Sequence, residues 1–589
     1  MLPITSQNMS LTKEILSHRF RWRLVILFLA VCSGLLGLSG PMFQKAFIDS
    51  LTIDGQSFSH SFQYLLYFFI FFMTSVATQL GAQYLGLKEA NIIQAEISKR
   101  IYTKMLRLKS SQMTGAQVGE VVSLYTVDAA GSAALLELAW TNGALTLVPI
   151  ILAPFMLQQM LNIPLAPLLI TMGVSLAIMF FLSWRQSHFF WTFKKLAAER
   201  TGLANEWIQN IRGLRSLNWI SSVENRIFKK RIAETENRIT MVSNGQVMAS
   251  LGSSVGFFLN LAGVFSLISM RENIPLSPGE LSATFWALGV YLARPLRGIP
   301  WILTFTLDSY TSIKRVEKFL GIPEKSLKVL ESVSLPNKGL LEIKSLNLEI
   351  AGQKLLHDVS LKIDTPEFVT IVGPVGSGKT LFVQSLIGEC AAIVERYHLL
   401  GKNVALLNEE QLKSHFSLVP QDGFIASTSI QNNIELDYES SGSPEIKDCL
   451  QYARFDLSAE GFSETERTLL GERGVNLSGG QKQRLGLARA LHAKRPILIL
   501  DDSMSALDVN TEVEMIDSLF RGMLKNQLIF LVTHRHSTLA LSDRTLFFMN
   551  GRLVGNAPYD VLLKTHSDFA KFIQQSREQE KDQGDELLK

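Results

Sequence analysis

The chain has 589 residues, of which 47% are hydrophobic, 9% aromatic and only 19% charged. It is longer than one ordinary domain and more apolar than an average soluble protein, so we expect a membrane-embedded part. The formal net charge of +4 is small for this length and excludes the dense basic face of a nucleic-acid-binding protein. Cys32, Cys390 and Cys449 show neither a metal-ligand spacing nor a paired framework.

The N-terminal region carries basic residues ahead of an apolar run from Leu24 to Leu38. This layout is typical of either a signal peptide or a first membrane anchor. We favour the anchor because further apolar segments follow it. A cleaved signal would also leave an odd number of crossings, which fits badly with a cytoplasmic C-terminal half.

Six stretches are apolar enough, to different degrees, to cross about 30 Å of hydrocarbon, which takes about 20 helical residues. The sixth is the weakest because it contains Arg294 and Arg297. One such stretch alone could be a buried core helix, but six in succession predict an all-α transmembrane domain. The stretches are Leu24 to Phe47, Phe62 to Leu87, Leu138 to Leu161, Pro164 to Trp184, Val247 to Met270 and Leu281 to Phe305.

The segments between these stretches alternate in charge. The first connection, Asp49 to Ser61, has no Lys or Arg, whereas the second and fourth connections are long and rich in both. Because cytoplasmic loops carry the excess of Lys and Arg, we expect both chain ends to be cytoplasmic. The long connections also predict helices that continue beyond the membrane, with turn-then-helix patterns at Thr114 to Leu124 and at Glu206 to Gly213. Either pattern could be a short crossing helix or an ordinary helical hairpin.

A different pattern begins after Phe319, where Gly and Pro residues mark a linker. Short β-like runs then alternate with helical stretches, which predicts an α/β domain with a largely parallel sheet. We expect a transmembrane domain at 1–321, a linker at 322–338, a nucleotide-binding domain at 339–570 and a charged, solvated tail at 571–589.

A complete phosphate-binding loop follows the predicted strand Phe368 to Val372 and precedes a helix that begins near Leu381. Its glycines let backbone N–H groups point at phosphate oxygens, and the following helix N-terminus adds its dipole. We expect Lys379 to reach the terminal phosphates and Thr380 to ligate Mg²⁺. A glycine-rich turn with a chance lysine is disfavoured by this strand and helix context. The loop consists of Gly373, Pro374, Val375, Gly376, Ser377, Gly378, Lys379 and Thr380.

Two acidic residues end the apolar run that begins at Ile497. Carboxylates at the end of a buried parallel strand face the ligand crevice. We expect Asp501 to hold Mg²⁺ and Asp502 to orient the attacking water. A surface turn of acids is the alternative, and the phosphate loop disfavours it.

The pentapeptide Leu477, Ser478, Gly479, Gly480 and Gln481 resembles the signature of ABC ATPases. The resemblance implies that Gln421 senses Mg²⁺, that Asp508 belongs to the D-loop and that His534 contacts the γ-phosphate. In the membrane half, Gly119 to Leu124 with Asp128 resembles the first coupling segment of ABC exporters. The order of the domains resembles a half-transporter, which implies ATP and Mg²⁺ as cofactors, a second half-transporter as partner and a lipid environment.

The chain departs from the family pattern at two positions. The residue after the Mg²⁺-binding Asp is usually Glu, and here it is Asp502, whose carboxylate is set back by roughly 1.5 Å. Misplacement on that scale can cost on the order of a hundredfold in rate. The position that usually holds an aromatic residue stacked on adenine is Ile350, which keeps an apolar contact but loses the stacking.

An intact signature beside a weakened base predicts one subunit of a heterodimeric exporter, in which the signature completes the partner's ATP site. A homodimer that tolerates Asp502 is the alternative. We expect export of an amphiphilic or hydrophobic substrate across a bacterial inner membrane, and no peptidase domain is expected before the membrane part. The alternative function is a regulatory membrane module that uses ATP as a clamp.

Overall fold

The computed structural model describes residues 10–52, 58–109, 118–161, 164–270, 277–324, 326–330, 339–421, 423–437, 443–457, 465–471, 477–504, 509–521, 524, 526–533 and 535–586. The chain divides into two compact units. The membrane unit comprises Met1–Arg107 and Ala116–Pro323, and the ATPase unit comprises Leu108–Gly115 and Glu324–Lys589.

The membrane unit is helical throughout its described residues. Three of its helices, α4, α8 and α10, have 50, 45 and 51 residues. At 1.5 Å per residue each is about 70 to 75 Å long, more than twice the roughly 30 Å of bilayer hydrocarbon. The elements are α1 (Leu11–Ser17), α2 (Phe20–Leu38), α3 (Gly40–Thr52), α4 (Phe58–Arg107), α5 (Val118–Ser123), η2 (Leu124–Asp128), α6 (Ala129–Ala134), η3 (Leu135–Thr141), α7 (Asn142–Leu161), α8 (Leu165–Gln209), α9 (Ile211–Ser216), α10 (Ile220–Met270), α11 (Pro278–Ala287), η4 (Leu288–Ala293) and α12 (Arg294–Leu320).

Among the described residues, five helical segments are long and apolar enough to cross a membrane. They leave large apolar side chains exposed, as at Phe180 and Phe257, which are 63% and 67% exposed. Such surfaces are stable only in an apolar surrounding. The sixth expected span lies in the helical run of α11, η4 and α12, which contains Arg294 and is not among the five. The five segments are Phe20–Thr52, Ser61–Arg107, Glu120–Gln159, Leu165–Gln209 and Ile220–Ile268.

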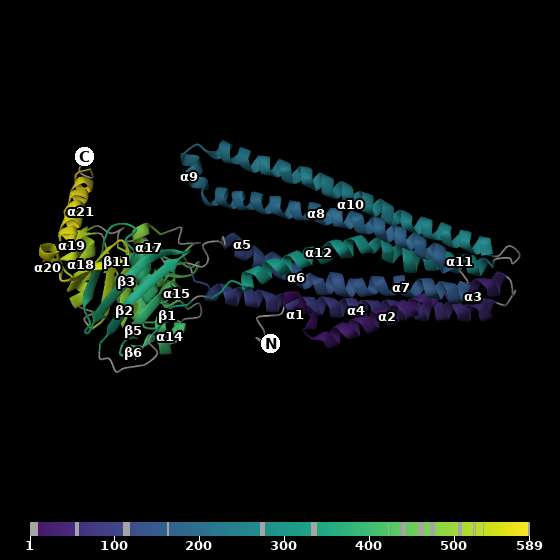
Figure 1. The fold of residues 1–589 in the computed structure, drawn as a ribbon, viewed down its shortest axis with the longest axis horizontal. Coiled ribbons are helices and arrows are strands. Elements are labelled where there is room, and N and C mark those ends of the chain that lie inside the picture. The colour runs from purple at the N-terminus through teal and green to yellow at the C-terminus, as the bar shows by residue number, and fades with distance from the viewer. Residues whose placement is uncertain are drawn as a thin grey trace. The chain divides into compact units, whose positions relative to one another are not determined.

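Helices α8 and α10 run side by side and are joined at one end by α9 (Figure 1). The short helix α9 lies where the pattern from Glu206 to Gly213 predicted a turn between two long helices. A buried amide pair links α8 to α10, because Asn244 Nδ2 donates to Gln186 Oε1 at 2.8 Å. An ion pair of 2.9 Å between the half-exposed Arg315 and the buried Asp128 joins α12 to η2.

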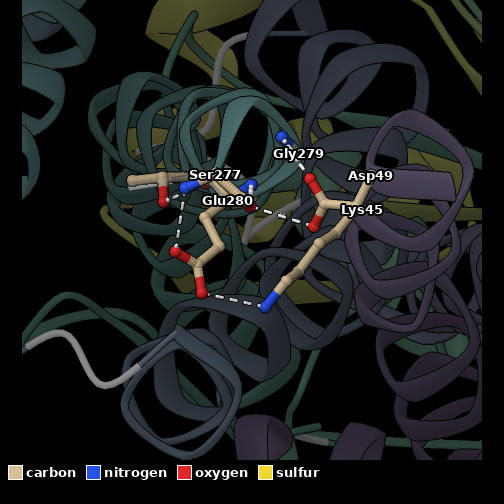
Figure 2. A network of polar contacts seen from close by, with 6 residues as sticks. Lys45, Asp49, Ser277, Gly279 and Glu280 are labelled. Carbon is tan, nitrogen blue, oxygen red and sulfur yellow. Dashed lines mark hydrogen bonds and ion pairs between the residues drawn. The ribbon is translucent and has the colours of Figure 1, made fainter. Parts of the chain in front are cut away.

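A polar network joins α3 to the first turn of α11, and Figure 2 shows it. The Asp49 carboxylate accepts hydrogen bonds from the Gly279 backbone N–H and from Ser277 Oγ, both at 2.9 Å. Lys45 Nζ donates to Glu280 Oε1 at 3.0 Å. Ser277 and Glu280 also form a capping box. Asp49 therefore satisfies one of the free N–H groups of α11, a helix more than 200 positions away in the chain.

We expect Asp49→Ala to destabilise the first turn of α11, since loss of an N-terminal cap costs about 1 to 2 kcal/mol. Hydrogen exchange of the purified full-length protein in nanodiscs should show faster exchange at the amides of Gly279 and Glu280. Asp49→Asn is the control, because its side-chain oxygen still accepts a hydrogen bond. Unchanged exchange in the alanine variant would contradict a capping role.

The ATPase unit contains a six-stranded sheet in the order β11-β10-β4-β9-β8-β7. All neighbours in this sheet pair in parallel except β10 and β11. Every residue of β4, β8 and β9 is buried, as expected for a parallel sheet covered on both faces. The strands are β4 (Phe368–Val372), β7 (Phe416–Val419), β8 (Ile497–Asp501), β9 (Leu528–Val532), β10 (Arg544–Met549) and β11 (Arg552–Ala557).

A second, largely antiparallel sheet has the order β1-β5-β2-β3, with β6 paired to β5. Strands β2 and β3 form a hairpin whose turn residues, Ala351 and Gly352, have φ values of 52° and 83°. Two positive φ values give the turn a twist that suits a hairpin. β1 lies inside the segment expected as a linker. The strands are β1 (Lys328–Val329), β2 (Leu341–Ile350), β3 (Gln353–Ile363), β5 (Ile393–Leu399) and β6 (Lys402–Asn403).

Helices cover both faces of the parallel sheet. One apolar core includes α13 together with β2, β3 and β5, and the other includes α15, α16, α17 and α18. Phe569 and Ile573 of α21 are buried beside Phe547, and α21 continues through part of the segment expected as a solvated tail. The helices are α13 (Lys379–Leu386), η5 (Val404–Leu406), α14 (Glu409–Lys413), α15 (Ile430–Glu435), α16 (Glu445–Tyr452), η6 (Thr465–Arg467), α17 (Gly479–His492), α18 (Val509–Arg521), α19 (His536–Leu539), α20 (Tyr559–Thr565) and α21 (Ser567–Glu586).

Candidate functional site

The candidate site lies where the parallel strands end. The carboxyl ends of parallel strands meet at one edge of a sheet, which is where open α/β sheets bind ligands. The phosphate loop follows β4, Asp501 is the last residue of β8, and Gln421 lies two residues after β7. β9 separates β4 from β8. The order of the strands thus brings three distant segments of the sequence to the same edge.

The phosphate loop depends on its glycines. Gly373, Gly376 and Gly378 have φ values of 151°, 78° and 99°, which favour glycine. A Cβ atom at Gly373 would also lie 2.1 Å from the carbonyl oxygen of Phe548, so no larger residue fits there. Val375 is 93% exposed at the tip of the loop. Pro374 accepts a hydrogen bond of 3.1 Å from the Ser377 N–H, which tightens the turn.

Lys379, the residue after Gly378, begins α13 and is buried. Its Nζ donates to the carbonyl oxygens of Gly373 and Pro374 at 2.8 and 2.9 Å. Burial lowers the pKa of Lys379, while the carboxylates of Asp502 and Asp501 oppose that shift. The ammonium group is therefore held over the loop by carbonyl oxygens, which are acceptors that phosphate oxygens could replace.

The hydroxyl of Thr380 donates to Asp501 Oδ1 at 3.3 Å. Burial raises the pKa of Asp501, and the hydrogen bond from Thr380 opposes this effect. A hydroxyl and a carboxylate in contact are oxygen ligands of the kind that Mg²⁺ prefers. The described residues contain no cluster of three His, Cys, Asp or Glu side chains. A Mg²⁺ ion at this position would therefore depend on phosphate oxygens and water for its remaining ligands.

The side chain of Ser377 in the phosphate loop also suits a phosphate group. Ser377 is 4% exposed, and its Oγ has no hydrogen-bond partner in the described structure. An unpaired hydroxyl in a buried position costs free energy unless a ligand or water satisfies it. Together with the N-terminus of α13 and the Lys379 ammonium group, it forms a donor set that suits phosphate.

Asp502 has a left-handed backbone, with φ of 46°. Aspartate is several-fold enriched in this conformation relative to most residues. Gln421 Nε2 donates to Asp502 Oδ2 at 3.3 Å, so the side chain after β7 contacts the carboxylate after β8. Two of the predicted site residues are thus brought together.

Ile350 is the last residue of β2 and is partly buried against the core of the ATPase unit. Its position at the hairpin turn leaves part of the side chain accessible. Whether it contacts adenine stays a prediction. His534 and Asp508, also predicted as site residues, lie outside the described residues.

The signature pentapeptide forms the start of α17. Ser478 caps this helix, because its Oγ accepts a hydrogen bond of 3.2 Å from the Gln481 N–H, and Gln481 Oε1 accepts one in return from the Ser478 N–H. Leu477 is buried, whereas Ser478 and Gly479 are exposed. The positive end of the helix dipole at Gly479 and Gly480 therefore faces solvent.

Sequence reasoning missed Arg489, on the same helix. Its Nε donates to the carbonyl oxygen of Asn433 and its Nη1 to that of Phe424, each at 2.8 Å. Its burial lowers the pKa of Arg489, although guanidinium groups stay charged. The residue ties the signature helix to the segment that follows Gln421. Its Nη2 also donates to Asn433 Oδ1 at 3.2 Å. No spacing or motif indicated this role, because the two shorter hydrogen bonds go to backbone atoms.

Comparison with known proteins agrees with this architecture. A family model described as the ABC transporter transmembrane region matches residues 24–292, and one described as ABC transporter matches residues 356–505. The chain belongs to the ABC transporter family. The expected fold class, a helical transmembrane domain followed by an α/β ABC ATPase domain, is confirmed, and the chain is an integral membrane protein.

Relatives of this ABC transporter chain include proteins of about the same length and proteins that are much longer. It is 25% identical over 567 residues to the uncharacterized ABC transporter ATP-binding protein YknU of Bacillus subtilis, covering 94% of each chain. It is 25% identical over 512 residues to a multidrug resistance ABC transporter ATP-binding and permease protein of Lactococcus lactis, covering 85% of this chain and 84% of that protein. Against ABC transporter C family member 9 of Arabidopsis thaliana it is 27% identical and covers 94% of itself but only 36% of the relative.

A solved structure shares the fold. The structure of a bacterial Atm1-family ABC exporter with ATP bound matches with a TM-score of 0.80 at 18% identity, over 95% of this chain and 99% of that chain. This likeness shows that the transmembrane region has the exporter-type fold. The chain spans about a third of the length of the first curated relatives it matches, such as the Arabidopsis protein at 36%.

We expect Lys379→Ala to weaken ATP binding at this chain's own phosphate loop by at least about tenfold, because hydrogen bonds to charged groups contribute about 1.5 to 3 kcal/mol. Equilibrium binding of a fluorescent ATP analogue to the purified protein would measure the change. Lys362→Ala is the control, since Lys362 is an exposed lysine of the same unit that forms an ion pair with the exposed Asp364. Equal affinities of the Lys379 variant and the unaltered protein would contradict the assignment of the loop.

Proposed function

We propose that this chain is one subunit of an ATP-driven ABC exporter that moves an amphiphilic or hydrophobic substrate across the membrane. The observation that carries the proposal is the meeting of the phosphate loop, Asp501 and Gln421 at one edge of the parallel sheet. The ATPase unit follows a membrane unit of exporter-type fold in the same chain.

In this proposal the phosphate loop binds ATP, with Lys379 and Ser377 as donors to phosphate oxygens. Thr380, Asp501 and Gln421 hold Mg²⁺, which neutralises charge on the phosphates when bound. The contact of 3.3 Å between Thr380 and Asp501 supports this donor set. Ile350 supplies an apolar surface for adenine, and His534 and Asp508 act as the resemblance implies.

The site next to this phosphate loop is the slower of two ATP sites in our proposal. Asp502 has a shorter side chain than the glutamate expected at the base position, and its carboxylate is engaged by Gln421 at 3.3 Å. A base must lie within hydrogen-bond reach of the proton that it takes from water. A carboxylate that is set back and already paired is a weaker base for this purpose.

The signature pentapeptide, unlike the base position, matches the family pattern. Ser478 and Gly479 are exposed at the N-terminus of a 14-residue helix, where a phosphate from another subunit could dock. We therefore favour a heterodimer in which this chain completes the competent ATP site of a second half-transporter. A homodimer that tolerates Asp502 is the alternative.

ATP binding would act on the membrane unit by favouring a closed arrangement of two ATPase units. A ligand shifts such an equilibrium only by its differential affinity for the two states. Helices α4, α8 and α10 extend beyond the bilayer thickness and could carry that motion. The charge pattern supports a cytoplasmic position for both chain ends, and we propose the inner membrane of a bacterium as the location.

A regulatory module that uses ATP only as a clamp is the rival function, and Asp502 is the observation that favours it. We expect the purified chain alone to hydrolyse ATP slowly and to gain activity with its co-purified partner. Asp502→Glu should raise the activity of this chain's own site, by up to on the order of a hundredfold. Asp502→Asn is the control, because it keeps the size of the side chain but removes the carboxylate that acts as base.

Phosphate-release assays on each combination would separate the alternatives. Rapid hydrolysis by the unaltered chain alone would contradict the heterodimer. No hydrolysis in any combination would favour the clamp.

We further expect Ser478→Arg to lower the ATPase activity of the assembled dimer at least tenfold, because a bulky cation would block the exposed end of α17. ATP binding at this chain's own phosphate loop should be unchanged, as measured by photolabelling with an azido-ATP. Lys482→Ala, a change of charge one turn further along the same helix, provides a comparison. Full ATPase activity of the Ser478 variant would count against a shared site.

A further inference from the structure

A hollow polar surface lies on α4, just beyond the second apolar stretch. It has a volume of about 520 Å³ and is formed by one face of α4 together with Tyr125 of η2. We name it the α4 groove. Its lining residues are Asn91, Gln94, Ala95, Ser98, Lys99, Tyr102 and Tyr125.

The lining of the α4 groove follows from helical geometry. Six of its residues fall between positions 91 and 102 at alternating steps of three and one, which places them on one helix face. The opposite face packs into the membrane unit through Ile93, Ile97 and Ile101, which are at most 2% exposed. Packing thus holds this length of α4 in place and leaves the polar face free.

The polar side chains of the groove are unpaired within the part of the chain that the structure describes. Among the described residues, none of the six polar lining side chains forms a hydrogen bond or an ion pair with another residue. The two acidic residues nearby on α4 are engaged elsewhere, because Glu89 pairs with Arg19 at 3.2 Å and Glu96 with Arg100 at 3.6 Å. Lys99 is therefore the charged member of the lining, and no carboxylate of the lining neutralises it.

The remaining wall of the groove comes from an unusual helical turn. Tyr125 lies in η2, a π-helix, and is 48% exposed, whereas Leu124 and Asp128 at the two ends of η2 are buried. Short π-helical turns occur frequently at functional sites, because they redirect side chains from the regular helical positions. Here the turn directs Tyr125 toward the exposed face of α4. Tyr102, on the α4 side, is 53% exposed.

We propose that the α4 groove binds the anionic end of an organic substrate. Ammonium, carboxamide and hydroxyl groups all donate hydrogen bonds, and the lining has a positive charge but no negative one. Two tyrosine rings and Ala95 provide apolar surface for the rest of the molecule. A cation of similar shape would be repelled by Lys99, so the same residues discriminate between charges.

The position of the groove suits an amphiphile. Asn91 follows Leu87, the end of the apolar stretch, by about 6 Å along the helix, and Tyr102 lies about 17 Å further on. A charged end bound there would lie outside the hydrocarbon while an apolar part could remain in or near it. This inference rests on the proposed export function and specifies the class of substrate as an organic anion with an apolar body, such as an aromatic carboxylate or sulfonate.

The test compares two dyes with the same ring system, the anion fluorescein and the cation rhodamine 123, binding to the full-length protein in nanodiscs without nucleotide. Fluorescence anisotropy should show fluorescein binding at least tenfold more tightly. Lys99→Ala should weaken fluorescein binding about tenfold, since hydrogen bonds to charged groups are strong. Lys99→Arg should retain most of the affinity. The matched control is Lys88→Ala, which removes an exposed lysine of α4 outside the lining.

Equal losses in the Lys99 and Lys88 variants would overturn the proposal, because they would indicate attraction to general surface charge. Unchanged binding in the Lys99 variant would overturn it as well. A lipid headgroup is the other source of an anion, so binding is repeated in nanodiscs of phosphatidylcholine with and without phosphatidylglycerol. Equal affinity in both supports a transported solute, and loss with phosphatidylglycerol overturns that assignment in favour of lipid.

The experiments can refute the proposed export function and the proposed anion site independently of each other. ATPase activity that is absent in every combination, with fluorescein binding still dependent on Lys99, would overturn export but not the anion site. Normal ATPase activity, with fluorescein binding independent of Lys99, would overturn the anion site alone. Size-exclusion chromatography and circular dichroism of each variant confirm that it is folded.

Discussion

The parallel pairing of β4, β9, β8 and β7 is the constraint on which the candidate ATP site depends. Parallel strands expose their carboxyl ends along a single edge, so the segments after β4, β8 and β7 meet although they are up to about 130 positions apart in the chain. Burial of both sheet faces keeps the strands in register and therefore keeps these segments in place. The contacts from Thr380 to Asp501 and from Gln421 to Asp502 are consequences of that order.

A second constraint is the mismatch between helix length and bilayer thickness. Helices of 45 to 51 residues exceed the hydrocarbon by roughly 40 Å, so part of each helix must be stable in water. α4 meets this requirement by changing character along its length. Its apolar stretch exposes large hydrophobic side chains, whereas beyond Lys88 it buries a row of isoleucines and exposes polar residues. The α4 groove lies on this second part.

Several features were accessible from the sequence because they arise from local rules. The phosphate loop, the strand ending in Asp501 and the signature pentapeptide each depend on residues within a few positions of one another, and the structure places them as loop, strand end and helix start. Other features depend on residues far apart. The hydrogen bonds of Arg489 to backbone atoms and the cap that Asp49 provides for α11 have no signal in the sequence. A backbone acceptor is the same for every residue type, and the sequence does not indicate which helix end lies beside Asp49.

The sequence by itself indicated the two kinds of domain and the phosphate loop, since composition, apolar length and glycine spacing act locally. The family followed from the resemblance of the pentapeptide Leu477 to Gln481 to the ABC signature. The sequence also identified Asp502 as a departure from the usual glutamate. Only the tertiary structure decided that Asp502 has a left-handed backbone and contacts Gln421, and that Ser377 Oγ is buried without a partner. It likewise decided that six residues between Asn91 and Tyr102 line a hollow shared with Tyr125. These properties depend on strand order and helix packing, which arise from contacts between distant parts of the chain.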